Sequence, residues 1–266
     1  IIVLIPICYG LYLYYQQYSV QHSSKPQIET FVSLPTPSGK DLEIPVSLIP
    51  RQEQIIRHKG YTVSYNKDLK IPNWVSYELT RQETKGKEKR GDNFIADPLV
   101  KGAIATNADY ARSGYDKGHM APAADMKWSP DVMKESFYFS NMCPQHPQLN
   151  RRGWKNLEEK IRDWAVADSA IIIICGPIID KPSKTIGKNK VAVPERFFKV
   201  ILSPFVKPAR GIGFLFNNRQ AVEPLSTYAV SIDSIEKLTH MDFFSPLPDE
   251  IENAVEANAD YYQWPR

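Results

Sequence analysis

Alternating apolar and polar positions predict a pair of strands in the first half of the chain. Residues 61–66 and 74–80 both alternate in this way, and Asn66-Lys67-Asp68 and Pro72-Asn73 supply turn residues between them. We expect these two segments to pair as antiparallel strands. Three more strands are predicted from apolar runs farther along the chain, at residues 171–175, ending at Gly176-Pro177, and at 196–202 and 212–216.

Apolar residues at helical spacing predict helices between and after these strands. The clearest covers residues 151–164, with Asn150 as a natural N-cap and an apolar face made by Trp154, Leu157, Ile161 and Trp164. Ser129 ahead of Pro130 predicts a helix over 130–138. Two shorter helices are expected at 231–238 and 250–258, and His240 stands where a glycine usually ends a helix. Strands and helices do not alternate regularly, so the expected fold class is α+β.

The N-terminal part differs from the rest of the chain. Residues 1–24 contain no Lys, Arg, Asp or Glu and are mostly apolar up to Tyr15, which predicts a hydrophobic anchor or signal segment. A buried first helix is the alternative interpretation. Residues 25–50 are rich in Pro and Ser and are interpreted as a linker. The catalytic domain is expected to occupy residues 51–266.

Composition limits the function only loosely. The 266 residues carry a net charge of +3, and the hydrophobic fraction of 42% excludes wholesale disorder. Basic residues concentrate at 81–90 and 181–190, whereas the C-terminal part is acidic. Basic loops favour a polyanionic partner, although solvated lysine loops are the simpler explanation. The three cysteines match no zinc or redox motif and indicate no disulfide framework.

Two segments carry the candidate chemistry. The first, residues 116–125, places His119 after Gly118, which permits backbone geometry that other residues resist, and an imidazole is a suitable base near neutral pH. The second runs from residue 141 to 162. In a helix, Glu158 and Arg162 are four residues apart, and the simplest interpretation of such a spacing is an ion pair. Asn150 is either a simple N-cap or an amide-oxygen ligand for a hard cation such as Mg²⁺.

These segments resemble a known family. Asp116-Lys117-Gly118-His119-Met120-Ala121-Pro122-Ala123 is similar to the D-R-G-H-x-A-P-A signature of the DNA/RNA non-specific endonucleases, the ββα-metal nucleases that include the endonuclease G group. The continuation of that signature is matched by Asn141, Pro144-Gln145, Asn150, Trp154 and Leu157-Glu158, and its upstream arginine by Arg90. The resemblance covers residues 60–245. It implies a ββα-metal fold with a central, mostly antiparallel sheet flanked by helices.

The resemblance also implies a role for each matched residue. It makes His119 the general base and Asn150 the direct ligand of one Mg²⁺, with Mn²⁺ or another divalent cation as a substitute, and Glu158 a ligand through water. It assigns phosphate binding to Arg90 and Arg162. The remaining assignments are positioning of the site by Asn141 and a supporting or substrate-binding role for Asp116 and Lys117. Lys117 departs from the family arginine and loses its bidentate fork.

The implied reaction is hydrolysis of DNA and RNA that leaves 5′-phosphate ends. Contacts to the phosphate backbone would explain an absence of sequence specificity. The resemblance further implies a homodimer. Together with the N-terminal segment, it predicts membrane association and an extracytoplasmic enzyme, anchored or secreted, in a bacterial periplasm or exterior, with the mitochondrion as the alternative.

Two other functions remain open from the residues themselves. One is a membrane-tethered nucleic-acid-binding protein with impaired catalysis, of which Lys117 would be the first sign. The other is a cysteine hydrolase that uses Cys143 with His119. No helix N-terminus that would lower the pKa of Cys143 is evident in the sequence, which disfavours this second function.

Overall fold

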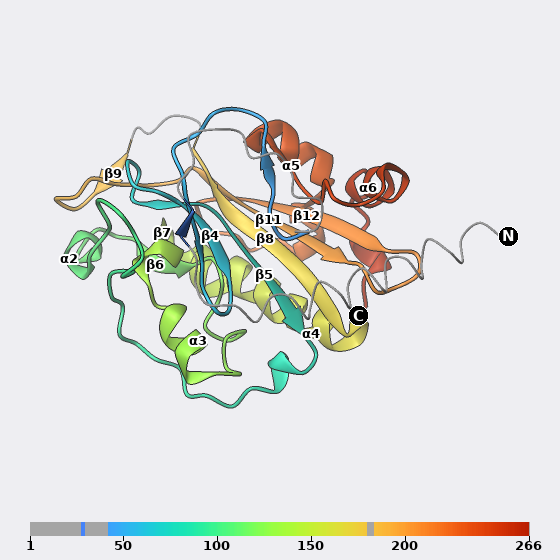
Figure 1. Cartoon of the computed structure of the whole chain (residues 1–266), viewed down its shortest axis with the longest axis horizontal. Coiled ribbons are helices and arrows are strands. Elements are labelled where there is room, and N and C mark those ends of the chain that lie inside the picture. Colours follow the sequence, from blue (N-terminus) through green and yellow to red (C-terminus); the bar gives the residue numbers. More distant parts are fainter. Residues whose placement is uncertain (1–27, 30–41, 180–183, 266) are drawn as a thin grey trace, which may run out of the picture.

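The computed structural model describes residues 28–29, 42–179 and 184–265 (Figure 1). The strands are β1 (Ile28–Glu29), β2 (Val46–Ser47), β3 (Gln54–Arg57), β4 (Thr62–Asn66), β5 (Ile71–Thr80), β6 (Asp116–His119), β7 (Met142–Gln145), β8 (Ala170–Ile178), β9 (Thr185–Ile186), β10 (Val191–Ala192), β11 (Arg196–Ser203), β12 (Arg210–Asn217), β13 (Ala229–Val230) and β14 (Met241–Asp242). The α-helices are α2 (Asn107–Tyr110), α3 (Pro130–Glu135), α4 (Lys155–Asp168), α5 (Ile232–Thr239) and α6 (Asp249–Glu256). Short helical turns of other types lie at Glu83–Lys85, Phe139–Asn141, Leu149–Trp154, Leu225–Tyr228 and Tyr261–Gln263.

An eight-stranded antiparallel sheet forms the centre of the molecule. Its strand order is β1-β3-β4-β5-β8-β11-β12-β13. The predicted antiparallel pair at 61–66 and 74–80 is confirmed as β4 and β5. The three later predictions are β8, β11 and β12, but β8 does not end at Gly176, because it continues through Pro177 to Ile178 opposite β11.

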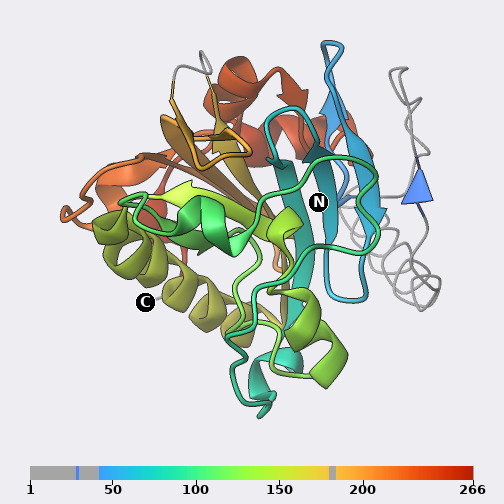
Figure 2. The ribbon, with the colours of Figure 1, turned by 90° about the vertical axis from the view of Figure 1, so that its left-hand side faces the viewer.

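Strand β8 shows how the sheet separates two cores. Ile171, Ile173 and Cys175 face the core that contains α4, whereas Ile172 and Ile174 face the core that contains α5 and α6. Alternate side chains of a strand point to opposite faces, so a continuous apolar run is expected where both faces are covered. Figures 1 and 2 show the β6–β7 pair and α4 on one side of the sheet and α5 and α6 on the other.

Helix α4 differs from its predicted bounds. The prediction placed it at residues 151–164, but a π-helical turn (η3) occupies Leu149–Trp154 and α4 follows at Lys155–Asp168. The predicted N-cap role of Asn150 is therefore wrong, because Asn150 lies inside η3 and its side chain bonds elsewhere. The predicted apolar face is confirmed, since Trp154, Leu157, Ile161 and Trp164 are all buried.

The smaller helices follow their predicted positions more closely. Ser129 precedes α3 with Pro130 in the first turn, although the Ser129 side chain makes no capping hydrogen bond. Ser231 does cap α5, where its hydroxyl accepts from the Ser234 backbone N–H. His240 ends α5 in the left-handed conformation, with φ of 52°, as expected for the position where glycine is usual.

The packed part of the chain begins before residue 51. Leu42 is buried, and β2 pairs with β14, so residues 42–50, which were assigned to the linker, lie against the domain. Residues 1–24 lie outside the described residues. Within the described ranges, no helix has the length and apolar character needed to cross a membrane.

Candidate active site

Strands β6 and β7 bring the two motif segments together. They pair antiparallel, with Gly118 opposite Cys143 and His119 opposite Met142. The chain then passes through η3 into α4, which packs on the same face of the central sheet. Strand β6 carries Asp116, Lys117 and His119, the turn η3 carries Asn150, and α4 carries Glu158 and Arg162, so the two motif segments lie together.

Gly118 is required for space rather than for an unusual backbone angle. It is absent from the residues with positive φ, contrary to the conformational role predicted for it. A Cβ atom at this position would instead overlap the side chain of Gln145, which lies across the strand pair. The glycine therefore permits β6 and β7 to approach with Gln145 between them.

His119 is buried against aromatic side chains. The residue is 8% exposed, and its ring packs against Phe94 and the edge of Phe137, with centroids 5.6 and 5.0 Å away. Burial lowers the pKa of His119 to about 3, with further lowering by the charges of Arg90 and Lys117. The imidazole is therefore neutral at physiological pH. Its Nε2 is buried and has no hydrogen-bond partner among the described residues.

Both cations that act on His119 also touch its aromatic neighbours. The guanidinium of the exposed Arg90 lies 5.5 Å from the centre of the Phe137 ring. Lys117 Nζ lies 4.1 Å from the centre of the Phe94 ring and donates to Asn107 Oδ1 at 2.9 Å. These contacts hold Lys117 beside the aromatic neighbours of His119, and burial lowers the pKa of its ammonium group.

Asp116 fixes the orientation of Asn150. Asn150 Nδ2 donates to Asp116 Oδ2 at 2.9 Å, and Arg151 donates to both carboxylate oxygens at 2.8 and 2.7 Å. Burial raises the pKa of Asp116, but the hydrogen bonds of Arg151 and Asn150 outweigh it and leave the pKa below its usual value. Because Nδ2 is engaged, Oδ1 of Asn150 is the atom left to bind a ligand.

Glu158 and Arg162 do not form the predicted ion pair within the described structure. Arg162 instead donates to Asp125 Oδ1 at 2.7 Å, and Tyr77 Oη donates to Asp125 Oδ2 at 2.8 Å. Burial raises the pKa of Glu158 to about 8, although Lys199, the largest opposing charge, acts to lower it. A nearby cation stabilises the ionised form of such a buried carboxylate.

The donor set fits a hard divalent cation. The amide oxygen of Asn150 and the carboxylate of Glu158 lie on the continuous segment η3–α4, and neither has a hydrogen-bond donor among the described residues. One or two protein oxygens, with water in the other positions, are the usual environment of Mg²⁺. A dication would also offset the burial that raises the pKa of the Glu158 carboxyl.

Asn141 contributes structure rather than a reactive group. It is fully buried, and its side chain accepts from Ala121 N–H and donates to the carbonyls of Ala121 and Ser136, each at 2.8 Å. All three bonds hold backbone beside His119. These hydrogen bonds are consistent with the positioning role that the resemblance implies for Asn141.

The thiol of Cys143 is unsuited to nucleophilic catalysis. It is fully buried, and burial raises its pKa well above the usual value. Cysteine hydrolases require an accessible thiolate, which the structure does not provide at this position. The cysteine-hydrolase alternative is therefore not supported.

Three residues of the site were missed by the sequence analysis. Asp125 and Tyr77 anchor Arg162, and Lys199 lies under the site, fully buried, with its Nζ 4.4 Å from the centre of the Trp154 ring. A single lysine inside the apolar run of β11 was the available signal for a buried charge. Trp154 in turn donates from its indole N–H to the backbone oxygen of His119 at 3.2 Å.

Comparisons with known proteins give the family. A family model described as DNA/RNA non-specific endonuclease matches residues 38–250. The chain is 30% identical over 250 residues to a nuclease of Nostoc sp., with 88% of each chain covered. It is 33% identical over 213 residues to mitochondrial endonuclease G of Homo sapiens, covering 73% of this chain and 71% of that protein. A chain in a crystal structure of the EndoG/EndoGI complex matches with a TM-score of 0.69 and 29% identity, covering 74% of this chain and 87% of that one.

The chain belongs to the DNA/RNA non-specific endonuclease family. It is a nuclease, which is a hydrolase of phosphodiester bonds. The predicted fold class, α+β with a central antiparallel sheet flanked by helices, is confirmed as well.

Proposed function

We propose that this nuclease is a Mg²⁺-dependent endonuclease that cleaves DNA and RNA without sequence specificity and uses His119 as its general base. The observation that supports this most is the buried, neutral imidazole of His119 with an unpartnered Nε2. A base must be unprotonated at the working pH and must have a free nitrogen to receive the proton. Both conditions are met by one residue of the family motif.

In the proposed reaction, Nε2 of His119 accepts a proton from a water molecule as its oxygen attacks phosphorus. The bond from phosphorus to the 3′ oxygen then breaks, and the 3′ oxygen takes a proton from solvent water, which leaves a 5′-phosphate end and a 3′-hydroxyl end. Phe94 and Phe137 pack against the imidazole, and Trp154 binds the backbone of the same residue. These contacts hold the base in one orientation, as a reacting geometry requires.

The divalent cation would be held directly by Asn150 Oδ1 and through water by Glu158. Bound there, it would neutralise charge on the phosphate and on the leaving oxygen. Asp116 supports this assignment because it occupies the amide N–H of Asn150 and leaves only the oxygen. Mn²⁺ has the same preference for oxygen ligands and would substitute for Mg²⁺.

Arg90 and Arg162 are proposed to bind the scissile phosphate and its neighbours. Arg162 is anchored by Asp125, so its position is fixed before substrate arrives. Arg90 is exposed and lacks such an anchor among the described residues, so it would close onto the substrate. Contacts of this type recognise phosphate and carry no sequence information, which is consistent with action on both nucleic acids.

Location and assembly remain predictions. The relatives include a bacterial nuclease and mitochondrial nucleases, which is consistent with both predicted compartments. Membrane association through residues 1–24 and formation of a homodimer are likewise proposals. Fractionation of the full-length chain between membrane and soluble pools would test the first. Sedimentation of the purified domain would test the second.

A cleavage assay tests the proposed function directly. Supercoiled plasmid and a structured RNA are incubated with the protein in Mg²⁺, in Mn²⁺ and in chelator, and products are tested for 5′-phosphate by ligation. We expect both substrates to be cut with either metal and neither to be cut in chelator. Retardation of DNA without cleavage under any divalent cation would instead support the impaired binding protein.

A further inference from the structure

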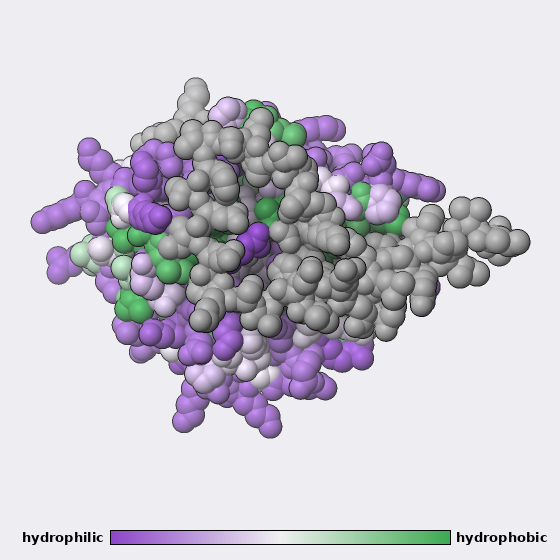
Figure 3. Space-filling view, viewed as in Figure 1, coloured by the Kyte–Doolittle hydropathy of each residue, from purple (hydrophilic) through white to green (hydrophobic). Residues whose placement is uncertain are grey.

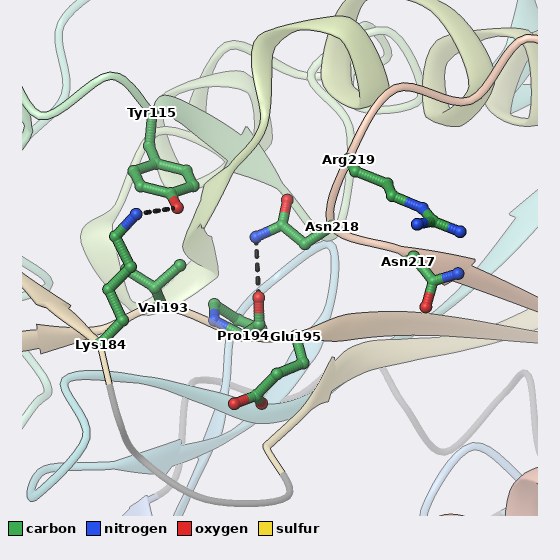
Figure 4. A pocket seen from close by; sticks show the side chains of 8 residues that line it. All are labelled: Tyr115, Lys184, Val193, Pro194, Glu195, Asn217, Asn218 and Arg219. Atoms are coloured by element: carbon green, nitrogen blue, oxygen red, sulfur yellow. Dashed lines mark hydrogen bonds between the residues drawn. The ribbon is translucent and has the colours of Figure 1, made fainter.

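A polar pocket lies beside the β6–β7 pair, outside the residues assigned above to the chemistry. Its volume is about 420 Å³, which falls in the range of about 300–1,000 Å³ common for small-ligand sites. Tyr115 and Lys184 form one side, Asn217 and Arg219 the other, and Asn218 lies between them (Figure 4). The other lining residues are Val193, Pro194 and Glu195.

The pocket presents two cations and an aromatic ring. Lys184 and Arg219 are exposed, and neither has an acidic partner in the described ranges. Lys184 Nζ donates to Tyr115 Oη at 2.8 Å and lies 4.8 Å from the centre of the ring, which holds the two side chains together. Among the described lining residues Glu195 is the one acid, and its carboxylate extends away from Tyr115 and Asn218 (Figure 4).

Asn218 connects the pocket to the active-site strands. Its Oδ1 accepts from His146 N–H at 2.7 Å, and its Nδ2 donates to the Pro144 and Pro194 carbonyls at 3.1 and 2.8 Å. Tyr115 directly precedes Asp116 at the start of β6. The pocket therefore lies at the Asp116 end of β6, and His119 lies at the other end, roughly 10 Å away for three residues at about 3.3 Å each.

A strand of nucleic acid would cross this distance within a few nucleotides, since duplex strands advance about 3.4 Å per nucleotide. Hydrophilic side chains also border the described part of the face drawn in Figure 3, including the region near β9, the strand that begins directly after Lys184. A polyanion that leaves the catalytic site along the Asp116 end of β6 would thus come within reach of the pocket.

We propose that this pocket binds a nucleotide of the substrate strand that flanks the cleaved bond, with its phosphate at Lys184 and Arg219 and its base against Tyr115. The inference rests on the proposed nuclease function. Cations bind phosphate without reading sequence, and an aromatic side chain packs against any of the bases. Such a subsite lengthens the contact with substrate while it keeps the enzyme non-specific.

The test uses the double variant Lys184→Ala/Arg219→Ala and two substrates. One is a single-stranded oligonucleotide of about twelve nucleotides, long enough for typical single-strand sites. The other is bis(4-nitrophenyl) phosphate, a diester that offers a scissile phosphate and no flanking nucleotide. We expect the KM for the oligonucleotide to rise by about tenfold with kcat nearly unchanged, and the rate on the diester to stay at the wild-type value.

Lys188→Ala/Lys237→Ala is the matched control, because it removes the same charge from exposed lysines outside the pocket. An equal rise in KM in this control, or no rise in the pocket variant, overturns the proposal. Loss of diester cleavage in the pocket variant also overturns it, since the pocket would then belong to the catalytic centre. Adenosine 5′-monophosphate is titrated in parallel. A pocket variant that loses mononucleotide binding but keeps the wild-type KM would identify a free-nucleotide site and reject the strand subsite.

A different result is expected if the proposed nuclease function is wrong. In that case the wild-type protein cleaves neither substrate with any divalent cation. Affinity for the oligonucleotide, measured by fluorescence anisotropy in chelator, then decides the question for the pocket. Weaker binding by the pocket variant than by the control supports the subsite, and equal binding rejects it.

Discussion

At the scale of single residues, the burial of His119 sets the protonation state of its imidazole. An imidazole in water has a pKa near 6.5 and is partly protonated near neutral pH, whereas burial and two nearby cations lower the pKa of His119 to about 3. In the proposed mechanism His119 would thus be an unprotonated but weak base. Its proton transfer would rely on the charge neutralised by the cation and the arginines.

Replacement of His119 by Ala tests this role. We expect kcat to fall by about 10²–10⁴-fold, the usual contribution of a positioned base, with little change in affinity for DNA. Cleavage of plasmid under single-turnover conditions measures the first quantity and fluorescence anisotropy in chelator the second. Wild-type cleavage by the variant would remove His119 from the mechanism, and an equal loss of binding would reassign it to substrate recognition.

Asp116 is a second residue with a specific expected effect. If it orients Asn150, Asp116→Ala should raise the Mg²⁺ concentration for half-maximal activity by about 10–100-fold, as for other residues that support a metal ligand. Arg151→Ala is the control, because it removes the other partner of Asp116 and leaves the Asn150 bond. Direct binding of Mn²⁺, followed by electron paramagnetic resonance, should weaken in the first variant only. Equal metal affinity in both would show that Asn150 needs no such support.

The sequence indicated candidate residues more readily than it indicated their contacts. His119, Asn150 and Glu158 were selected because they fall in ordered motifs. That Arg162 pairs with Asp125 rather than Glu158 could not be predicted, because helical spacing shows which residues are neighbours on α4 but not which strand or loop lies opposite. Lys199 is a similar case, since its burial depends on where β11 lies in the sheet.

At the scale of elements, the β6–β7 pair depends on one close approach. Any side chain at position 118 would overlap Gln145. We expect Gly118→Ala to destabilise the fold by about 1–3 kcal/mol, the usual effect of overpacking, and to lower activity because His119 is the next residue in the chain. Unfolding in urea measures the first effect and plasmid cleavage the second.

The double variant Gly118→Ala/Gln145→Ala provides the control for that prediction. Shortening Gln145 removes the atoms that a new Cβ would meet, so the double variant should recover most of the stability lost by Gly118→Ala. Gln145→Ala alone should change little, since both polar atoms of Gln145 are buried without a hydrogen-bond partner among the described residues. Additive losses in the double variant would show that the glycine is needed for another reason.

Strand and helix types were predictable, but several boundaries were not. The sheet and the apolar face of α4 followed from periodicity, because burial on one or both faces of an element leaves a repeating pattern. The start of α4 could not be predicted, because the residue types of the π-helical turn at Leu149–Trp154 do not differ from those of the first turn of an ordinary α-helix. The packing of residues 42–50 was missed because β2 is a two-residue strand whose partner, β14, lies almost 200 residues later.

At the scale of the whole molecule, the proposed phosphate-binding cations and an acidic group lie on opposite sides of the central sheet. Arg90, Lys117 and Arg162 belong to the side that carries α4 and the β6–β7 pair. The other side carries an acidic group on α5, β14 and α6, made of Asp233, Glu236, Asp242, Glu252 and Glu256. Such a division favours approach of a nucleic acid to the catalytic side, because like charge repels it from the other.

Glu256 gives the last prediction, because the acidic group should lower stability at neutral pH. Burial raises the pKa of Glu256 to about 9, and the nearby carboxylates of Glu236, Glu252, Asp242 and Asp233 raise it further. Within the acidic group, Lys237 acts in the opposite direction and lowers the pKa of Glu236. The folded protein therefore holds a proton at Glu256 that the unfolded chain releases above a pKa near 4.5. Folding stability consequently falls as the pH rises from about 4.5 towards 9.

We expect Glu256→Gln to stabilise the fold by about 1–2 kcal/mol at pH 8, a fraction of the full shift because the half-buried neighbours are screened by solvent. The gain should be smaller at pH 5. Urea unfolding at both pH values measures it, with the exposed Glu250→Gln on the same helix as a control that should show no such pH dependence. The same gain at both pH values, or a loss at pH 8, would mean that Glu256 is ionised and stabilising in the folded protein.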